Sequence, residues 1–335
     1  MIISKANYFC YHIRFQTTYL INFKYEIKTE QGMKPGRIID TFVLWIILAI
    51  PFLGNGQQLT QIQKGYWVAC GDDKVLIINP AIGSDSSAIV WKWQFGESAN
   101  QIPKEYSNYF KSIDECKPVF SNKKILITSS TGATCLLNIA DKKIEFYAKT
   151  PMAHSADILP GKLVAVANST HPKGNSLELY QLDQPEKPIY KDTLYSGHGV
   201  VWNNRLQQLF VLGYDDLRTY KLTDAKKSLT LVNTIKIPEQ GGHDLSRIDD
   251  NRLLVSFTDG VVIFSIKERK FDPFSPLADA HHIKSIHWNA KTNRLVYTKA
   301  EESWWTYNIY ATNPNQKVYI PTLKLYKVVS AIRSS

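Results

Sequence analysis

The sequence predicts an all-β protein, and within that class a six-bladed β-propeller, with seven blades as the alternative. Three observations support this fold class. A hairpin unit recurs six times along the chain, helix signals are nearly absent, and the 335 residues include 18 Tyr, 8 Trp and 14 Phe, which are residue types enriched in strands. A propeller of this length commonly forms one domain.

The N-terminal part of the chain is set apart from the repeats. The basic stretch Met33–Arg37 leads into the apolar run Phe42–Leu53, which small polar residues follow. This is the order of regions in a secretory signal peptide, and the apolar run is short for a bilayer span. We therefore expect an upstream extension at 1–32, a signal peptide at 33–56 and a single propeller domain at 57–335, secreted or periplasmic and without stable membrane insertion after cleavage. The alternative is an uncleaved anchor.

The recurring unit is an apolar strand, a turn of Gly, Asp, Ser or Thr residues, and a second apolar strand, which is the pattern of a hairpin. It occurs at Tyr66–Asn79, Lys124–Ile139, Leu163–Tyr180, Leu209–Tyr220, Leu253–Ile266 and Leu295–Tyr310. Six units in residues 57–335 leave about 46 residues for each, which suits one four-stranded propeller blade. Stacking of blades buries both faces of each sheet, and this explains why the strands are almost continuously apolar.

Two aromatic residues and the C-terminal tail fit the same plan. Trp202 and Trp288 occupy matching places in the first strands of units four and six, so we expect them to pack between blades. The tail Leu323–Ile332 reads as one more strand. We expect it to complete the first blade, because closure of the ring removes the exposed edges.

Charge and cysteine content limit the classes of function. The formal net charge is +10, spread along the chain, which favours an anionic partner and gives no sign of a nucleic-acid site. Cys70, Cys116 and Cys135 lie in strand-like runs with no Cys-x-x-Cys spacing, so we expect small core residues. No phosphate loop, nucleophile elbow or His-Glu-x-x-His motif is present.

Histidines recur at the start of the predicted innermost strands, about one blade apart. The sequence has Ala153-His154, Gly197-His198, Gly242-His243 and Ala280-His281-His282, with Glu115 one blade earlier. In a propeller these positions converge on one mouth of the central channel. The sequence therefore predicts a cluster of imidazoles there.

Such a cluster suits two kinds of chemistry. Imidazole is a common ligand of divalent transition metals and titrates near neutrality. We expect a divalent metal, Mn or Zn, with four ligands: His154, His198, His243 and His282. The catalytic candidates, as general base or as groups that neutralise a carboxylate, are His198, His243 and Lys284. The predicted substrate-binding residues, including Trp that can stack on a sugar ring, are Glu115, His171, Tyr214, Trp304 and Trp305.

Residues 67–79, Gly197–Gly199, Gly242–Asp244 and Ala280–Ile286 resemble a functionally uncharacterised family of exported bacterial six-bladed propellers, which is distantly similar to the WD40/YVTN repeat class. The resemblance covers about residues 60–330 and implies the fold more than the function. A weaker similarity to oligogalacturonate lyase propellers implies histidines at the channel mouth and a metal that acts on a uronate.

A structural role for the histidines is the alternative. In WD40-type propellers a Gly-His pair at the start of a blade bonds to an Asp in the turn between the second and third strands. Asp216 and Asp259 are candidate partners of this kind for His198 and His243. However, the Trp-Asp pair of WD40 blades is missing, and the turn of the unit that begins at His154 has no Asp.

Two functions follow from these observations. The first is a monomeric exported protein that binds an anionic, uronate-type carbohydrate at the channel mouth and cleaves it by metal- or His-assisted β-elimination. The second is a non-catalytic scaffold for another protein of the cell envelope. Nucleic acid is not an expected partner.

Overall fold

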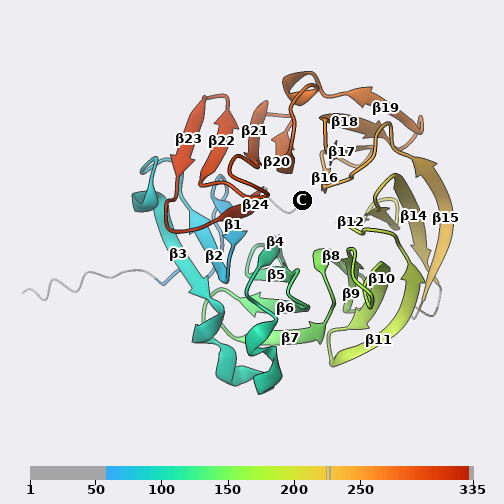
Figure 1. Ribbon diagram of the computed structural model, residues 1–335, viewed down its shortest axis with the longest axis horizontal. Coiled ribbons are helices and arrows are strands. Elements are labelled where there is room, and N and C mark those ends of the chain that lie inside the picture. The colour runs from blue at the N-terminus through green and yellow to red at the C-terminus, as the bar shows by residue number, and fades with distance from the viewer. Residues whose placement is uncertain (1–57, 224, 226–227, 332–335) are drawn as a thin grey trace, which may run out of the picture. The chain divides into compact units, whose positions relative to one another are not determined.

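The computed structural model describes residues 58–223, 225 and 228–331. They form six antiparallel four-stranded sheets arranged as the blades of a propeller (Figure 1), so the predicted six-bladed fold is confirmed and the seven-bladed alternative is wrong. The predicted extension and signal peptide lie outside the described residues. Among the described residues, no helix has the length and apolar character needed to cross a bilayer.

Blade 1 combines strands from both ends of the described chain, and blades 2 and 3 follow it in chain order. Blade 1 comprises β24 (Leu325–Ser330), β1 (Trp67–Gly71), β2 (Lys74–Ile78) and β3 (Ile89–Gln94). Blade 2 comprises β4 (Ile113–Val119), β5 (Lys124–Ser129), β6 (Ala133–Asn138) and β7 (Ile144–Lys149). Blade 3 comprises β8 (Ala153–Leu159), β9 (Leu163–Asn168), β10 (Ser176–Gln181) and β11 (Gln184–Thr193).

The other three blades follow in chain order. Blade 4 comprises β12 (Gly199–Asn203), β13 (Gln208–Leu212), β14 (Asp216–Leu222) and β15 (Leu229–Lys236). Blade 5 comprises β16 (Asp244–Arg247), β17 (Arg252–Phe257), β18 (Gly260–Ser265) and β19 (Lys270–Pro273). Blade 6 comprises β20 (Ile283–Asn289), β21 (Arg294–Lys299), β22 (Asn308–Thr312) and β23 (Gln316–Tyr319).

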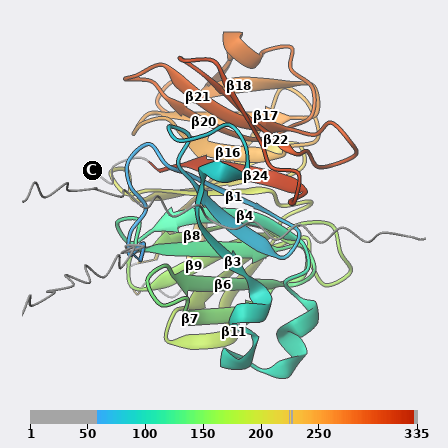
Figure 2. The ribbon, with the colours of Figure 1, turned by 90° about the vertical axis from the view of Figure 1, so that its left-hand side faces the viewer.

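Short 3-10 helices occur only in the connections of the described chain. They are η1 (Ser86–Ala88), η2 (Phe95–Glu97), η3 (Ala99–Gln101), η4 (Lys104–Asn108) and η5 (Ser275–Leu277). Three of them, η2 to η4, form the link from blade 1 to blade 2. In the side view of Figure 2, strands of blades 5 and 6 lie at one end of the molecule, strands of blades 2 and 3 at the other, and β24 and β1 between them.

The C-terminal strand closes the ring, as the sequence predicted. β24 pairs antiparallel with β1, with Trp67 opposite Ser330 and Val68 opposite Val329. It thereby supplies the innermost strand of a blade whose other strands come from the beginning of the described chain (Figure 1). Because β24 pairs with β1, blade 1 has four strands like the other blades, and the inner edge of β1 is not left unpaired.

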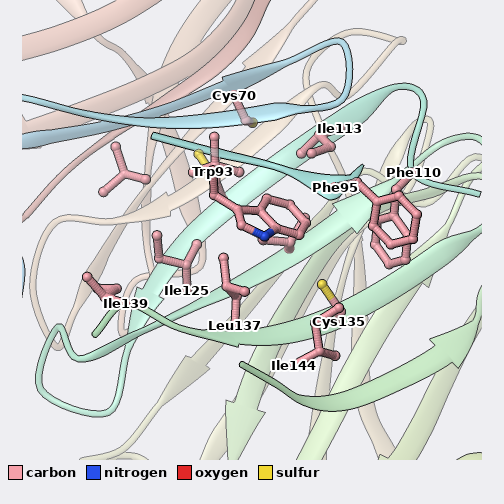
Figure 3. Packing of buried hydrophobic residues seen from close by; sticks show 14 of the residues in the cluster. Cys70, Trp93, Phe95, Phe110, Ile113, Ile125, Cys135, Leu137, Ile139 and Ile144 are labelled. Atoms are coloured by element: carbon pink, nitrogen blue, oxygen red, sulfur yellow. The ribbon is translucent and has the colours of Figure 1, made fainter. Parts of the chain in front are cut away.

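The hydrophobic core lies between neighbouring blades. One cluster joins blade 1 to blade 2 and includes Trp93 over the apolar face of blade 2, with Phe95 stacked on Phe110 at 4.7 Å (Figure 3). Clusters of the same kind join every other neighbouring pair, including blade 6 to blade 1. No blade buries its apolar faces alone, so the stability of each depends on its neighbours.

The predicted packing residues lie in these clusters. Trp202 belongs to the cluster between blades 3 and 4, and Trp288 packs against Phe274 at the boundary of blades 5 and 6, with 5.2 Å between ring centroids. The three predicted core cysteines, Cys70, Cys116 and Cys135, are buried free thiols.

Candidate functional site

The innermost strands of all six blades begin on the same face of the disc, and one side chain from each blade marks this point. These six residues, called the mouth ring here, are Asp114, His154, His198, His243, Lys284 and Tyr326. In four blades the strand pairing skips this residue, which leaves it in a β-bulge: Asp114, His154, Lys284 and Tyr326. In the other two blades, His198 and His243 directly precede the inner strand. A bulge re-aims a side chain, and here it directs ring members away from the regular alternation of the strand.

The mouth ring is a set of side chains in contact with one another. The ring centroids of His154 and His198 are 4.4 Å apart, and those of His198 and His243 are 5.5 Å apart. Lys284 Nζ lies 3.2 Å from His243 Nε2, and the rings of His154 and Tyr326 are 6.2 Å apart. Residues more than 150 positions apart in the chain, His154 and Tyr326, thus share one cluster.

Hydrogen bonds to backbone carbonyls fix the tautomers of two of the imidazoles. His154 Nδ1 lies 2.9 Å from the carbonyl oxygen of Met152, and His198 Nδ1 lies 2.8 Å from that of Ser196. A carbonyl oxygen only accepts, so in each histidine Nδ1 carries the proton and donates it. In the neutral form of each ring, the lone pair is therefore on Nε2.

Burial controls the charge of the ring. It lowers the pKa of His198 well below the usual value, and His154 and His243 add to this effect. Burial, followed by the charges of Lys284 and Lys327, lowers the pKa of His243 to about 3. Burial and then Lys327 lower the pKa of Lys284 to about 8. At pH 7 His198 and His243 are neutral, and Lys284 is the titratable cation of the ring.

A second layer of residues, the floor layer, lies directly below the ring and is polar in five of the six blades. It consists of the next residue of each inner strand: Glu115, Ser155, Gly199, Asp244, Ser285 and Lys327. Lys327 Nζ lies 2.9 Å from Asp244 Oδ1 and 3.6 Å from Glu115 Oε1. All three of these side chains are buried, so the channel contains a compact ion-paired triad below the mouth.

The floor layer also ties neighbouring blades together. Four of its side chains accept a backbone N–H from the inner strand of the next blade: Ala156 N to Glu115 Oε2 at 2.9 Å, Val200 N to Ser155 Oγ at 3.0 Å, Ile286 N to Asp244 Oδ2 at 2.9 Å and Val328 N to Ser285 Oγ at 2.8 Å. Glu115, predicted to bind substrate, belongs to this layer, and the ring member of its blade is Asp114.

Aromatic side chains lie beside the ring. Trp304 is 46% exposed, and its ring centroid is 6.0 Å from that of the ring member Tyr326. Tyr214 contacts Tyr195 at 5.5 Å, and Tyr195 is 59% exposed. Trp305 instead packs against Tyr307 at 4.9 Å and under Lys324.

Two predicted histidines lie outside the ring. His282 is exposed, has a φ of 62°, and donates its backbone N–H to Thr258 O at 2.9 Å. His171 is in an exposed turn, where its Nδ1 accepts the backbone N–H of Lys173 at 3.0 Å. The structure therefore brings the rings of three of the four predicted metal ligands into contact, those of His154, His198 and His243, whereas among the described contacts the ring of His282 meets only that of His281.

A family model covers residues 54–333, which is most of the chain, and its description is a family of unknown function, DUF6528. The chain belongs to the DUF6528 family. No functionally curated protein matches it. Its family membership therefore assigns no reaction to the mouth ring.

The histidines of this DUF6528 propeller do not have the partners expected from the WD40 pattern. Asp216 binds Arg218 at 3.1 Å, and Asp259 binds His281 of the following blade at 2.9 Å. His198 is held by its own loop, through Ser196 O. The described residues therefore do not form the expected pairs of His198 with Asp216 and of His243 with Asp259.

The donor set of the mouth ring fits a metal poorly. Among the described residues, no group of three or more His, Cys, Asp or Glu side chains is arranged to hold a metal ion. Nε2 of His243 faces the Lys284 ammonium at 3.2 Å, and a cation at that distance competes with a metal for the same lone pair.

Three residues beside the DUF6528 mouth were missed by sequence reasoning: Asp114, Tyr195 and Tyr326. Asp114 and Tyr326 could have been found by treating the last strand of the chain as an inner strand. Tyr326-Lys327 then occupies the same position in its blade as Lys284-Ser285 and Asp114-Glu115 do in theirs. Tyr195 precedes Ser196 in the loop that leads to His198, and an exposed aromatic residue in a polar loop was its available signal.

Proposed function

We propose that the mouth ring binds a carbohydrate that carries a carboxylate, of the uronate type, outside the cytoplasm. The observation that carries the proposal is Lys284, an amine that is 8% exposed and forms no ion pair with any carboxylate of the described residues. A buried cation without a counter-ion is costly, and an anionic ligand at the mouth relieves that cost.

The surroundings of Lys284 suit a sugar acid. Among the described residues its ammonium has one polar contact, with the neutral imidazole of His243, so it keeps donors for a carboxylate. Nε2 of His154 and His198 can accept from sugar hydroxyls. Trp304 offers an exposed aromatic face for stacking on a pyranose ring.

The same geometry supports β-elimination as the associated reaction. A base removes the proton on the carbon next to the carboxylate, the electron pair forms a carbon–carbon double bond as the glycosidic C–O bond breaks, and the leaving oxygen takes a proton from water. The best base has a pKa near the working pH. Lys284, at about 8, meets this condition better than His243, at about 3. His243 Nε2 then holds the lysine by accepting its N–H.

Binding and elimination have opposite pH dependences in this proposal. Carboxylate binding uses the ammonium form of Lys284 and weakens as pH rises through about 8. Elimination uses the free amine, so its rate at saturating substrate rises over the same range.

Calorimetric titration with trigalacturonate tests the binding step, and its methyl ester is the neutral control ligand. We expect Lys284→Met to weaken binding about tenfold or more, because a charge-assisted contact is lost. The matched control is Lys291→Met, which changes an exposed lysine at the other end of the β20–β21 hairpin and should leave affinity unchanged. Equal affinity for the acid and the ester, or for wild type and Lys284→Met, contradicts the proposal.

Two further assays separate the associated claims. Ultraviolet absorbance of the unsaturated product measures elimination. If the protein binds trigalacturonate but forms no unsaturated product, its function is binding without elimination. Titration with Mn²⁺ or Zn²⁺ of wild type and of the His198→Ala/His243→Ala double variant tests the metal. We expect no difference between the two proteins, and tighter metal binding by wild type would establish a metal at the ring.

A scaffold for another protein is the second candidate function, and a specific observation favours it. The outer strand β15 of blade 4 exposes two apolar side chains in succession, Leu231 at 46% and Val232 at 49%. Exposed apolar positions on an outermost strand suit contact with a protein partner. A stoichiometric partner recovered from the envelope fraction, and lost in a Leu231→Ser/Val232→Ser variant, would support this candidate.

A further inference from the structure

Exposed aromatic side chains gather on the mouth face, which is the face of the disc where the innermost strands begin. The exposed Phe, Tyr and Trp side chains of the described residues are Phe120, Tyr195, Trp304 and Tyr319. Tyr195 lies in the loop before His198, and the alternating strand directions of blade 6 place the β21–β22 connection, with Trp304, and the end of β23, with Tyr319, on the same face. Phe120 follows the opposite end of β4.

Blade 6 carries a row of aromatic side chains that starts at the mouth ring. The row, called the aromatic row here, consists of Trp304, Trp305, Tyr307 and Tyr319. Trp304 contacts Tyr326 of the mouth ring at 6.0 Å, and Trp305 is its neighbour in the sequence. The ring centroids of Trp305 and Tyr307 are 4.9 Å apart, and those of Tyr307 and Tyr319 are 6.1 Å apart. The row therefore runs from β24, beside the centre of the disc, to β23 at its rim (Figure 1).

Backbone hydrogen bonds hold the loop that carries both tryptophans. Thr306 N donates to Leu325 O at 3.0 Å, and Leu325 N donates to Thr306 O at 2.7 Å, which ties the loop to the start of β24. The N–H groups of Glu301 and Glu302 both donate to Trp305 O, at 3.1 and 3.2 Å. A surface that is already ordered loses little conformational entropy when a ligand binds to it.

The two ends of the aromatic row are exposed, and its middle is half-buried. Trp304 and Tyr319 are each 46% exposed, whereas Trp305 and Tyr307 are intermediate. Exposed aromatic faces offer stacking surfaces for sugar rings. A single sugar bound at the mouth ring meets Trp304 and not Tyr319, because the rings of Trp305 and Tyr307 lie between them. A ligand that contacts both exposed rings is therefore a chain of sugars.

Unpaired cations beside the row suit a chain with repeated carboxylates. Lys324 Nζ lies 5.1 Å from the centroid of the Trp305 ring, and Lys299 ends β21. Both lysines are exposed and form no ion pair with a carboxylate of the described residues. The carboxylate of Glu301 accepts three hydrogen bonds within blade 6, which leaves Glu302 as the unpaired acid of the loop. The unpaired lysines outnumber it, so the charge beside the row favours an anionic chain.

We propose that the mouth face binds a linear chain of uronate residues, with one carboxylate at Lys284 and the following sugars along the aromatic row to Tyr319. This inference rests on the proposed function and adds the length and the path of the ligand. The chain leaves the mouth ring across blade 6 toward the outer strand β23.

Calorimetric titration of wild type and Tyr319→Ala with hexagalacturonate and with galacturonate tests the row. We expect Tyr319→Ala to weaken hexagalacturonate binding about three- to tenfold, the effect of one aromatic stacking contact, and to leave galacturonate binding unchanged. Comparison of two proteins on the same ligand removes the statistical advantage of a hexamer with several carboxylates. The matched control is Phe120→Ala on the opposite face, since Phe120 is 42% exposed and also lies under a lysine, Lys124 at 4.9 Å. It should leave both affinities unchanged.

Lys284→Met separates the row from the mouth ring, because it should weaken the binding of both ligands. If Lys284→Met does so while Tyr319→Ala binds hexagalacturonate with wild-type affinity, the row is overturned and the proposed function stands. Equal weakening of both ligands by Tyr319→Ala would also overturn the row, because the loss would not depend on chain length. If neither acid binds to the wild-type protein, the proposed function fails and the inference fails with it.

Discussion

Replacement of Lys327 by methionine tests the buried triad at the centre of the propeller. Lys327 is 1% exposed, and its ammonium lies between Asp244 and Glu115 at 2.9 and 3.6 Å. Methionine keeps a long unbranched side chain but leaves two buried carboxylates without their shared cation. Removal of one partner from a buried ion pair costs about 3–5 kcal/mol. This is a large share of the about 5–15 kcal/mol by which domains are stable.

Urea unfolding measures this loss as a change in the free energy of unfolding, with the slope m as a check on two-state behaviour. The matched control is Lys324→Met in the same C-terminal segment. Lys324 is exposed and lies 5.1 Å from the Trp305 ring, so its replacement should cost no more than about 1 kcal/mol. A triple variant, Lys327→Met/Glu115→Gln/Asp244→Asn, should recover part of the loss, because neutral amides need no counter-ion.

The pH dependence has a defined sign. Burial alone would raise the pKa of Glu115, but Lys117, Lys327 and two hydrogen bonds together lower it. A carboxyl group whose pKa is lowered on folding stabilises the protein above its unfolded pKa of about 4.3, and this stability is lost as pH falls through the lower folded pKa. In Lys327→Met the acid loss should begin at a higher pH. A loss below about 1 kcal/mol at pH 7, with wild-type acid behaviour, would refute the claim that the triad depends on Lys327.

Two further predictions concern positions near the ring. A Cβ at Gly199 would lie 2.4 Å from Cβ of Leu245 in the next blade, so Gly199→Ala should destabilise the protein by about 1–3 kcal/mol. The control is Gly96→Ala, where a Cβ would have no atom within 4 Å and stability should change by no more than about 0.5 kcal/mol. Equal urea midpoints for the two variants would contradict the clash. Lys284→Met should raise the pKa of His243 above its value of about 3, because the charge of Lys284 is the second cause of the low value. Burial, the first cause, should still hold this pKa below the usual range of histidine. NMR titration of the imidazole measures the change, and an unchanged pKa would show that the ammonium has no effect.

Much of the fold could be predicted from the chain alone, because blades are local hairpins with a regular repeat. The six units and the closing role of the C-terminal strand were predicted, since alternation of apolar and turn residues is a property of neighbouring residues. The convergence of His154, His198 and His243 followed from that repeat and is present in the structure.

The membership of the mouth ring was decided by the tertiary structure. A β-bulge shifts which residue of a strand points toward the axis, and it depends on the pairing of two strands and not on one strand's sequence. For this reason the sequence predicted Glu115 where the ring contains Asp114, and it predicted His282 as a metal ligand where the ring contains Lys284, which was predicted only as a catalytic residue.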